Sequence, residues 1–161
     1  MKRLYLVRHG KAEDYDHERH TSDVDRALTA EGRDEMEFVA KRMRKLDEKI
    51  EVVLSSPLRR ARETAEILAK GLHVEMEIFA DLTPPVSPGR LLKAVRARKE
   101  DRIVLVGHEP GVGDCLGRWI SELSLSVPFK KGGVARIDMP LSSSDGPGVL
   151  VWLATPEVMG A

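Results

Sequence analysis

The run Leu4–Val7 constrains the fold of this chain most strongly. Four consecutive apolar residues are typical of a buried strand, which usually takes a central place in a sheet. Arg8, His9 and Gly10 follow, so we expect them at the carboxyl end of the strand, where α/β sheets bind ligands. Arg8 offers a donor fork suited to phosphate, His9 a nitrogen that attacks or shuttles protons, and Gly10 room for a sharp turn. The alternative is a strand that ends in a solvated Arg-His pair.

The run Ile103–Val106 resembles the first one and ends in Gly107 and His108. It therefore predicts a second buried strand with a histidine at its carboxyl end. If the two strands are parallel neighbours, both imidazoles face one crevice at the edge of the sheet. A single histidine could stand there by chance, but two at equivalent strand ends favour a functional site.

Two helices are indicated between these strands. The first is expected after Thr29, a good N-cap, with an apolar stripe at Met36, Val39, Ala40, Met43 and Leu46. The second is expected to begin with Ser56 as N-cap and Pro57 as its first residue, and to end at Gly71. Its buried stripe comprises Leu58, Ala61, Ala65 and Leu68.

Two further helices are predicted on either side of the second long strand. Ser87 and Pro88 begin one of them, whose buried positions are Leu91, Leu92 and Val95. The other follows Pro110, and its apolar face comprises Val112, Cys115, Leu116, Trp119, Ile120 and Leu123. Because Cys115 lies on that face, we interpret it as a small core residue and not as a nucleophile.

The remaining strands complete an α/β pattern. Residues 52–54 form a short buried strand, and residues 74–79 alternate with glutamates as a half-exposed or edge strand does. Residues 134–138 and 148–154 read as two strands joined by the turn at 142–147. Strands that alternate with helices predict a mostly parallel sheet, here with a late antiparallel pair.

Three arginines, Arg59, Arg60 and Arg62, occupy the first two turns of the second helix. Cations are disfavoured there because the helix dipole already presents positive charge at its N-terminus. A bound anion would relieve the conflict and accept hydrogen bonds from free backbone N–H groups. Arg60 fits this role best; the alternative is three solvated arginines.

The segment Lys11–Arg26 is polar and has no apolar period, so we expect a long loop that leaves the first strand. His17 and His20 are spaced like a metal-binding pair. No cysteine, third histidine or patterned acidic partner accompanies them, and we interpret both as solvated loop residues.

Composition excludes several classes of protein. The 161 residues suit one domain, residues 1–161, and the 26 basic and 26 acidic side chains cancel, which argues against nucleic acid and anionic membranes as partners. No run approaches the roughly 18 apolar residues of a membrane span, and no signal segment precedes the first strand. A single cysteine fits a reducing compartment, so we expect a cytoplasmic protein.

The motifs together resemble those of the histidine phosphatase superfamily, which includes the phosphoglycerate mutases. Leu6–Gly10 resembles its first motif, Ser56–Ala65 its second, and Val106–Pro110 its third. Their order and spacing, and the small size of the chain, are most similar to the SixA-type phosphohistidine phosphatases. An arginine before a Leu-Thr helix start, here Arg26, also faces the site in that group.

The resemblance implies a three-layer α/β/α sandwich and covalent catalysis. His9 would be the nucleophile that carries the phosphoryl group, and Arg8, Arg26, Arg60 and His108 would bind its oxygens. Arginine suits this role because its fork is planar and permanently charged. We expect no metal ion and no other cofactor, since fixed cationic groups already match the phosphate.

Many relatives carry an acidic residue after the third strand as a general acid. Asp81 is the only candidate in that stretch of this chain. The alternative is that Asp81 caps the turn at Leu82–Pro84 through its side chain.

Three functions follow from these residues. The first is a phosphatase that acts on phosphohistidine of a protein, which fits a chain with little spare length for a lid over the site. The second is a phosphatase or mutase of a small phosphorylated metabolite. The third, a non-catalytic phosphate-binding module, is disfavoured because a binder needs no nucleophile. No oligomeric state is predicted.

Overall fold

A computed structural model describes residues 1–161, and its centre is a six-stranded sheet with the strand order β3-β2-β4-β1-β5-β6. The strands are β1 (Lys2–Arg8), β2 (Val52–Ser55), β3 (Glu75–Ile78), β4 (Arg102–Gly107), β5 (Val134–Met139) and β6 (Val149–Ala154). The first four strands in this order run parallel, whereas β5 and β6 are antiparallel to their neighbours. This arrangement confirms the predicted sheet, including β3 at an edge.

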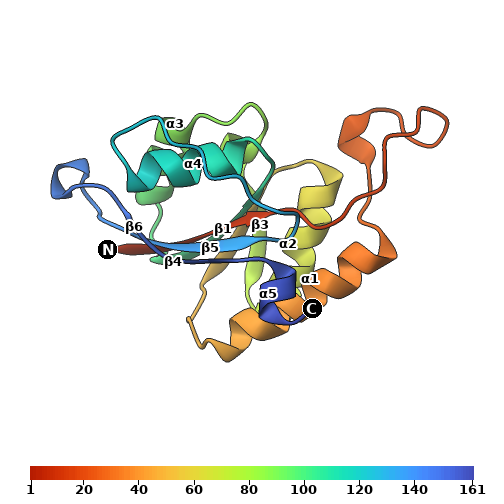
Figure 1. The fold of residues 1–161 in the computed structure, drawn as a ribbon, viewed down its shortest axis with the longest axis horizontal. Coiled ribbons are helices and arrows are strands. Elements are labelled where there is room, and N and C mark those ends of the chain that lie inside the picture. The colour runs from red at the N-terminus through yellow and green to blue at the C-terminus, as the bar shows by residue number, and fades with distance from the viewer.

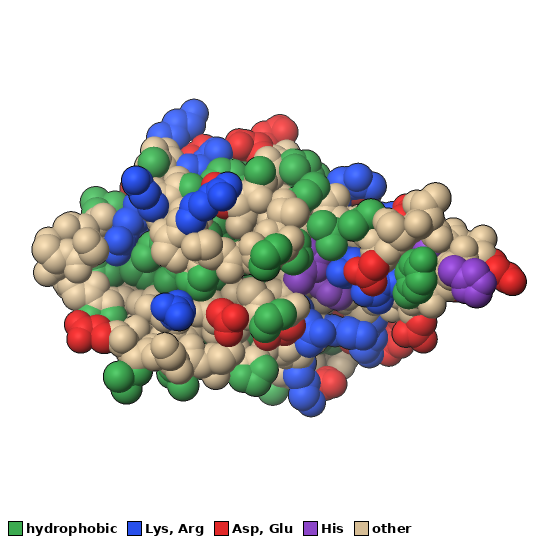
Figure 2. All heavy atoms as spheres, turned by 90° about the horizontal axis from the view of Figure 1, so that it is seen from above, with side chains coloured by type: hydrophobic (Ala, Val, Ile, Leu, Met, Phe, Trp, Pro, Cys, Tyr) green, Lys and Arg blue, Asp and Glu red, His purple; other side chains and the backbone are tan.

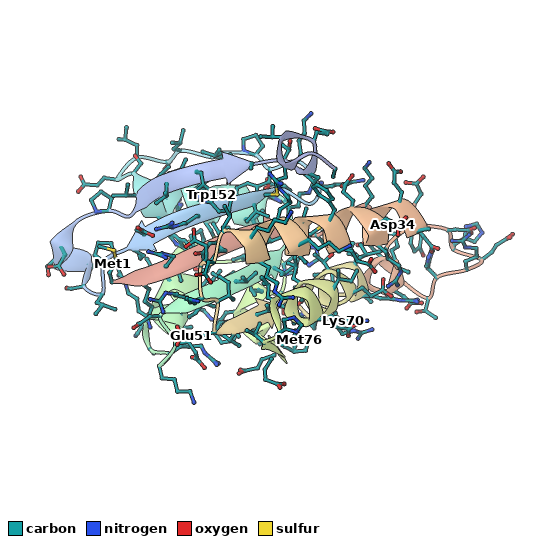
Figure 3. The ribbon with its side chains drawn as sticks, turned by 90° about the horizontal axis from the view of Figure 1, so that it is seen from below. Met1, Asp34, Glu51, Lys70, Met76 and Trp152 are labelled. Atoms are coloured by element: carbon teal, nitrogen blue, oxygen red, sulfur yellow. The ribbon has the colours of Figure 1, made fainter.

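Helices cover both faces of the sheet (Figure 1). On one face lie α1 (Ala30–Lys45), α2 (Arg59–Leu72) and the short α5 (Pro156–Met159); on the other lie α3 (Pro88–Arg96) and α4 (Gly111–Ile120). Figure 3 shows α1 and α2 side by side across the first face. The three-layer α/β/α class is therefore confirmed. None of these helices combines the length and the apolar character that a membrane span requires.

The strand β1 supplies side chains to both layers of the core. Tyr5 and Val7 belong to the apolar cluster under α1 and α2, and Leu4 and Leu6 to the cluster under α3 and α4. All four are fully buried, as expected for an apolar run in the middle of a sheet. Cys115 is buried in the α3/α4 cluster, and burial raises the pKa of its thiol to about 12, which confirms it as a core residue.

The predicted start of α1 is confirmed and that of α2 is wrong. The Thr29 hydroxyl accepts a hydrogen bond from the Gly32 N–H, as an N-cap does. In α2 the N-cap is Leu58, two residues after the expected Ser56, and no side chain caps the helix. The Ser56 hydroxyl is instead directed toward His108. A contact between two residues that are far apart in the sequence therefore overrides the local capping pattern.

The predicted end of α2 is also wrong. The helix continues through Gly71 to Leu72, and His73 caps it in the left-handed conformation with φ of 60°. Gly71 stays inside the helix because α1 approaches closely there: a Cβ atom on Gly71 would lie 2.6 Å from the Cβ of Ala40. The glycine is a packing requirement of the α1/α2 interface and not a stop signal.

Two residues assigned to apolar stripes lie outside the core. Leu46 and Leu123 follow the last residues of α1 and α4, and they are 53% and 76% exposed. Leu58, Leu92 and Ile120 are only partly buried. Apolar periodicity therefore located the helices correctly but extended the stripes of α1 and α4 beyond the ends of these helices.

The contact at Gly71 gives a test of the fold. Gly71→Ala should lower the free energy of unfolding by about 1 kcal/mol, because overpacking against Ala40, typically about 1–3 kcal/mol, outweighs the helix propensity gained, about 1 kcal/mol. Urea unfolding at unchanged m-value measures the difference. Gly89→Ala in α3 is the matched control: nothing lies within 4 Å of its Cβ position, so stability should stay equal or rise. Equal effects of both variants would contradict the packing argument.

Candidate active site

The pairing of β1 with β4 brings the two predicted histidines together. The strands are parallel neighbours in a register that aligns Arg8 with Gly107, so His9 and His108 both follow at the same edge of the sheet. Their ring centroids are 5.2 Å apart. In Figure 2 histidine side chains reach the surface with basic and acidic side chains beside them. The expected juxtaposition of the two imidazoles is confirmed.

His9 is held in one orientation and one tautomer. Its side chain is buried, and Nδ1 lies 2.7 Å from the carbonyl oxygen of Gly10. Because a carbonyl oxygen can only accept, Nδ1 carries the proton and Nε2 keeps its lone pair. The Thr64 hydroxyl accepts a hydrogen bond from the Gly10 N–H and fixes the turn after His9. The free nitrogen of His9 is therefore Nε2.

The environment keeps His9 neutral. Burial is the largest cause, and the charges of Arg60 and Arg8 and the neighbouring His108 add to it. The hydrogen bond to Gly10 acts in the opposite direction, and the net effect lowers the pKa of His9 to about 3. At neutral pH the Nε2 lone pair is consequently available to attack an electrophile.

His108 is oriented by Ser56. The Ser56 hydroxyl lies 2.8 Å from Nε2 of His108 and also accepts a hydrogen bond from the Leu58 N–H. A hydroxyl has one proton and two lone pairs, so Ser56 can donate to Nε2 while it accepts from Leu58. In that arrangement the ring proton of His108 lies on Nδ1. Burial and then the charge of Arg60 lower the pKa of His108 to about 4. In this tautomer the neutral His108 has a free donor at Nδ1.

Three buried N–H donors at this site have no acceptor in the protein. Five buried side-chain N or O atoms lack a hydrogen-bond partner, and three of them are Nε of Arg8, Nε of Arg60 and Nδ1 of His108. Leaving a buried donor unpaired costs about 1–3 kcal/mol. The three come from different elements, and all belong to residues that act electrostatically on the His9 site. An anion is the ligand that would satisfy them.

The three arginines of α2 separate into one site residue and two surface residues. Arg60 is buried and its charge acts on both histidines. Arg59 forms ion pairs with Glu63 and Asp25, and Arg62 lies near Glu66 on the surface. This agrees with the expectation that Arg60 is the one directed at the site.

Arg26 lies at the rim of the site and shares an acidic partner with Arg60. Its Nε donates to Oδ1 of Asp23 at 2.9 Å, and Nη2 of Arg60 donates to Oδ2 at 3.2 Å. Asp23 belongs to the 3-10 helix η1 (Asp23–Asp25). The sequence analysis did not single it out, although its spacing of three residues from Arg26 is that of a helical ion pair.

No hydrogen bond or ion pair joins Asp81 to either of the two histidines. It lies in the 3-10 helix η2 (Ala80–Leu82) and forms an ion pair with the exposed Arg90 of α3. The carboxylate of Asp81 accepts no hydrogen bond from the backbone of the turn, so the alternative of a side-chain cap is not found. Asp81 faces a small polar pocket lined by Thr83, Ser87 and Arg90.

The interpretation of His20 as a solvated residue is wrong. His20 is buried; its Nδ1 accepts from the Asp16 N–H at 3.0 Å, which leaves Nε2 to donate to Glu13 at 3.1 Å. His20 therefore links Glu13 and Asp16 within the segment that follows β1. His17 is exposed, as expected. A contact within an irregular segment has no periodic sequence signal. No three His, Cys, Asp or Glu side chains gather in a metal-binding arrangement.

Comparisons with known proteins agree with this geometry. Residues 4–83 match the model of the histidine phosphatase superfamily (branch 1). An uncharacterised protein of Picosynechococcus sp. is 40% identical over 140 residues, which cover 81% of both chains. The structure of the protein histidine phosphatase SixA complexed with tungstate superimposes with a TM-score of 0.83 at 26% identity, over 96% of this chain and 97% of that one. Phosphoserine phosphatase of Entamoeba histolytica, solved with 3-phosphoglyceric acid, has the same fold with a TM-score of 0.71 at 17% identity, over 96% and 98% of the two chains.

The lowered pKa of His9 predicts how stability depends on pH. Below pH 6.5 the unfolded chain binds a proton at His9, whereas the folded protein does not until about pH 3. The unfolded state therefore binds more protons in this range. As the pH is lowered, this residue decreases the free energy of unfolding by up to roughly 1.4 kcal/mol per pH unit. His9→Gln should remove this part of the slope between pH 6 and 4.5, measured by urea unfolding. Parallel curves for the two proteins would contradict a buried neutral His9.

Proposed function

The chain belongs to the histidine phosphatase superfamily, and from this we propose that it is a phosphatase whose His9 carries the phosphoryl group and whose main substrate is phosphohistidine on a protein. One observation carries the proposal. Three buried donors, on Arg8, Arg60 and His108, have no acceptor and surround a histidine that is kept neutral. That set combines a phosphate-binding site with a nucleophile, which a simple anion-binding module would not need.

Catalysis would proceed in two steps. Nε2 of His9 attacks phosphorus in line, a P–N bond to His9 forms, and the bond to the leaving group breaks. Water then attacks the phosphohistidine, the P–N bond breaks, inorganic phosphate leaves and Nε2 regains its lone pair. In both steps Arg8, Arg60 and Nδ1 of His108 donate to the oxygens on which charge is spread, with Arg26 at the rim.

Protein phosphohistidine is supported as the substrate by two considerations. The protein histidine phosphatase SixA superimposes with a TM-score of 0.83 at 26% identity, against 0.71 at 17% for the phosphoserine phosphatase. In addition, the imidazole of phosphohistidine can take up a proton on its other ring nitrogen before the P–N bond breaks, and it then leaves as a neutral molecule. Such a leaving group needs little help from a general acid, and no acidic side chain is hydrogen-bonded to His9.

A phosphatase of small metabolites is the second candidate. The Entamoeba histolytica phosphoserine phosphatase with bound 3-phosphoglyceric acid has the same fold, so the architecture also serves a small phosphorylated acid. Alkyl phosphates release a basic alkoxide, and its departure needs a proton donor worth typically about 10²–10⁴ in rate. Asp81 would be the candidate donor, and it would have to leave its ion pair with Arg90 to act.

The nucleophile can be trapped. Brief incubation with substrate followed by a quench should leave an acid-labile, base-stable phosphoryl group on the peptide that contains His9. His9→Ala should abolish turnover, while vanadate or phosphate still binds because Arg8, Arg60 and His108 remain. Mass spectrometry and calorimetry measure the two results. Activity that persists in the variant would remove His9 from the role of nucleophile.

The leaving group can be tested through Asp81. We expect Asp81→Asn to change kcat/KM for a phosphohistidine peptide by less than about tenfold, and to lower kcat/KM for an alkyl phosphate far more if that ester is accepted. Arg90→Gln, which removes the partner of Asp81, is the control for a structural effect of the broken ion pair. An equal loss on both substrates would assign Asp81 as the general acid and favour the metabolite phosphatase.

A further inference from the structure

Asp23 occupies the outer side of the arginine that is directed at the site. Its backbone carbonyl accepts from Nη1 of Arg60 at 2.9 Å and its Oδ2 accepts from Nη2 at 3.2 Å. Each terminal nitrogen of Arg60 therefore donates one of its N–H groups to Asp23, whereas Nε has no partner in the protein. The side chain of Asp23 is nevertheless 59% exposed, so a bound molecule can meet its charge.

Other contacts hold the segment between β1 and α1 in place without the charge of the Asp23 carboxylate. Nη1 of Arg26 donates to the carbonyl of Glu13, and the Glu63 carboxylate accepts from the Leu28 N–H at 2.7 Å. His20 and Glu13 connect the segment internally. The Asp23 carboxylate is exposed, and other contacts already anchor the segment. Because it lies beside a site for anions, its charge can act on a bound ligand.

Charge balance indicates that role. Arg8, Arg26 and Arg60 contribute three positive charges, His9 and His108 are neutral, and Asp23 subtracts one. Partial burial opposes ionisation of Asp23, but the charges of Arg60 and Arg26 lower its pKa, so the carboxylate is ionised at neutral pH. The net charge of +2 matches one phosphoryl dianion. A further negative group on the leaving group would meet the negative charge of Asp23.

We infer that Asp23 is a specificity-determining residue: it favours phosphorylated substrates whose leaving group is neutral or cationic, such as a protonated imidazole, over substrates whose leaving group carries a carboxylate. The inference rests on the proposed function, because it assigns a leaving-group preference to the same site. Asp23 acts by attraction to a protonated imidazole and by repulsion of an acid, and both arise from the single charge on its carboxylate.

The test uses substrates that differ only in charge. Phenyl phosphate and carboxyphenyl phosphate share one leaving-group skeleton, and a phosphohistidine peptide supplies the cationic case. Asp23→Asn keeps the backbone carbonyl that Arg60 binds. It removes the charge and replaces one of the two side-chain acceptors, which face Arg26 and Arg60, by an amide donor. We expect the variant to raise kcat/KM for carboxyphenyl phosphate relative to phenyl phosphate by about tenfold and to lower it for the phosphohistidine peptide several-fold. Both changes should shrink at 1 M salt.

Asp25→Asn is the matched control, because Asp25 lies in the same η1 element but pairs with the surface residue Arg59. It should leave the ratio between the two phenyl substrates unchanged. A change in Asp23→Asn that is equal for all three substrates would mean that Asp23 only positions Arg60, and would overturn the inference.

Binding separates this inference from the proposed function. Phenylphosphonate and carboxyphenylphosphonate cannot be hydrolysed, and their dissociation constants for wild type and Asp23→Asn report the same preference without catalysis. If no substrate is turned over, the proposed function fails, yet a selective gain in affinity for carboxyphenylphosphonate would still support the role of Asp23. Equal affinities of both proteins for both phosphonates would overturn it.

Discussion

The parallel pairing of β1 with β4 is the interaction on which the site depends. Its register aligns Arg8 with Gly107, and so the next residue of each strand, His9 and His108, emerges at the same level of the same edge. A shift of one residue would turn one imidazole into the opposite layer of the core, because side chains alternate along a strand. The buried apolar residues of both strands fix this register, and the hydrophobic core thereby sets the distance between the two rings.

The same burial has a cost in folding free energy. Desolvation keeps both histidines uncharged, and it leaves donors of Arg8, Arg60 and His108 without an acceptor. Unpaired buried donors and clustered like charges oppose folding, and a natural sequence keeps such groups where a ligand compensates for them. The same unpaired donors and positive charges that destabilise this edge of the sheet give it affinity for a phosphoryl group. A bound anion should therefore stabilise the folded state.

Sequence alone predicted the parts of this arrangement that have a periodic or local signal. The two strand ends were evident from apolar runs followed by His9 and His108, and Arg60 from the conflict between a cation and a helix N-terminus. Ser56, Gly71, His20 and Asp23 were misread or missed. Each of them is determined by a contact with a residue distant in the chain or in an irregular segment: His108, Ala40, Glu13 and Arg60. Local propensity carries no information about such partners, and tertiary contacts override it.

One face of α2 connects these separate contacts. Arg60, Glu63 and Thr64 are spaced by three and four residues and so share that face. Arg60 meets Asp23, Glu63 accepts from the Leu28 N–H, and Thr64 accepts from the Gly10 N–H while donating to the Arg60 carbonyl. The helix thereby positions the phosphate-binding arginine, the segment that carries Arg26 and the turn after His9 from a single rigid element. The second sequence motif is long because these three tasks occupy more than one turn of helix, and its acidic and hydroxyl residues are as much a part of the site's geometry as its arginine.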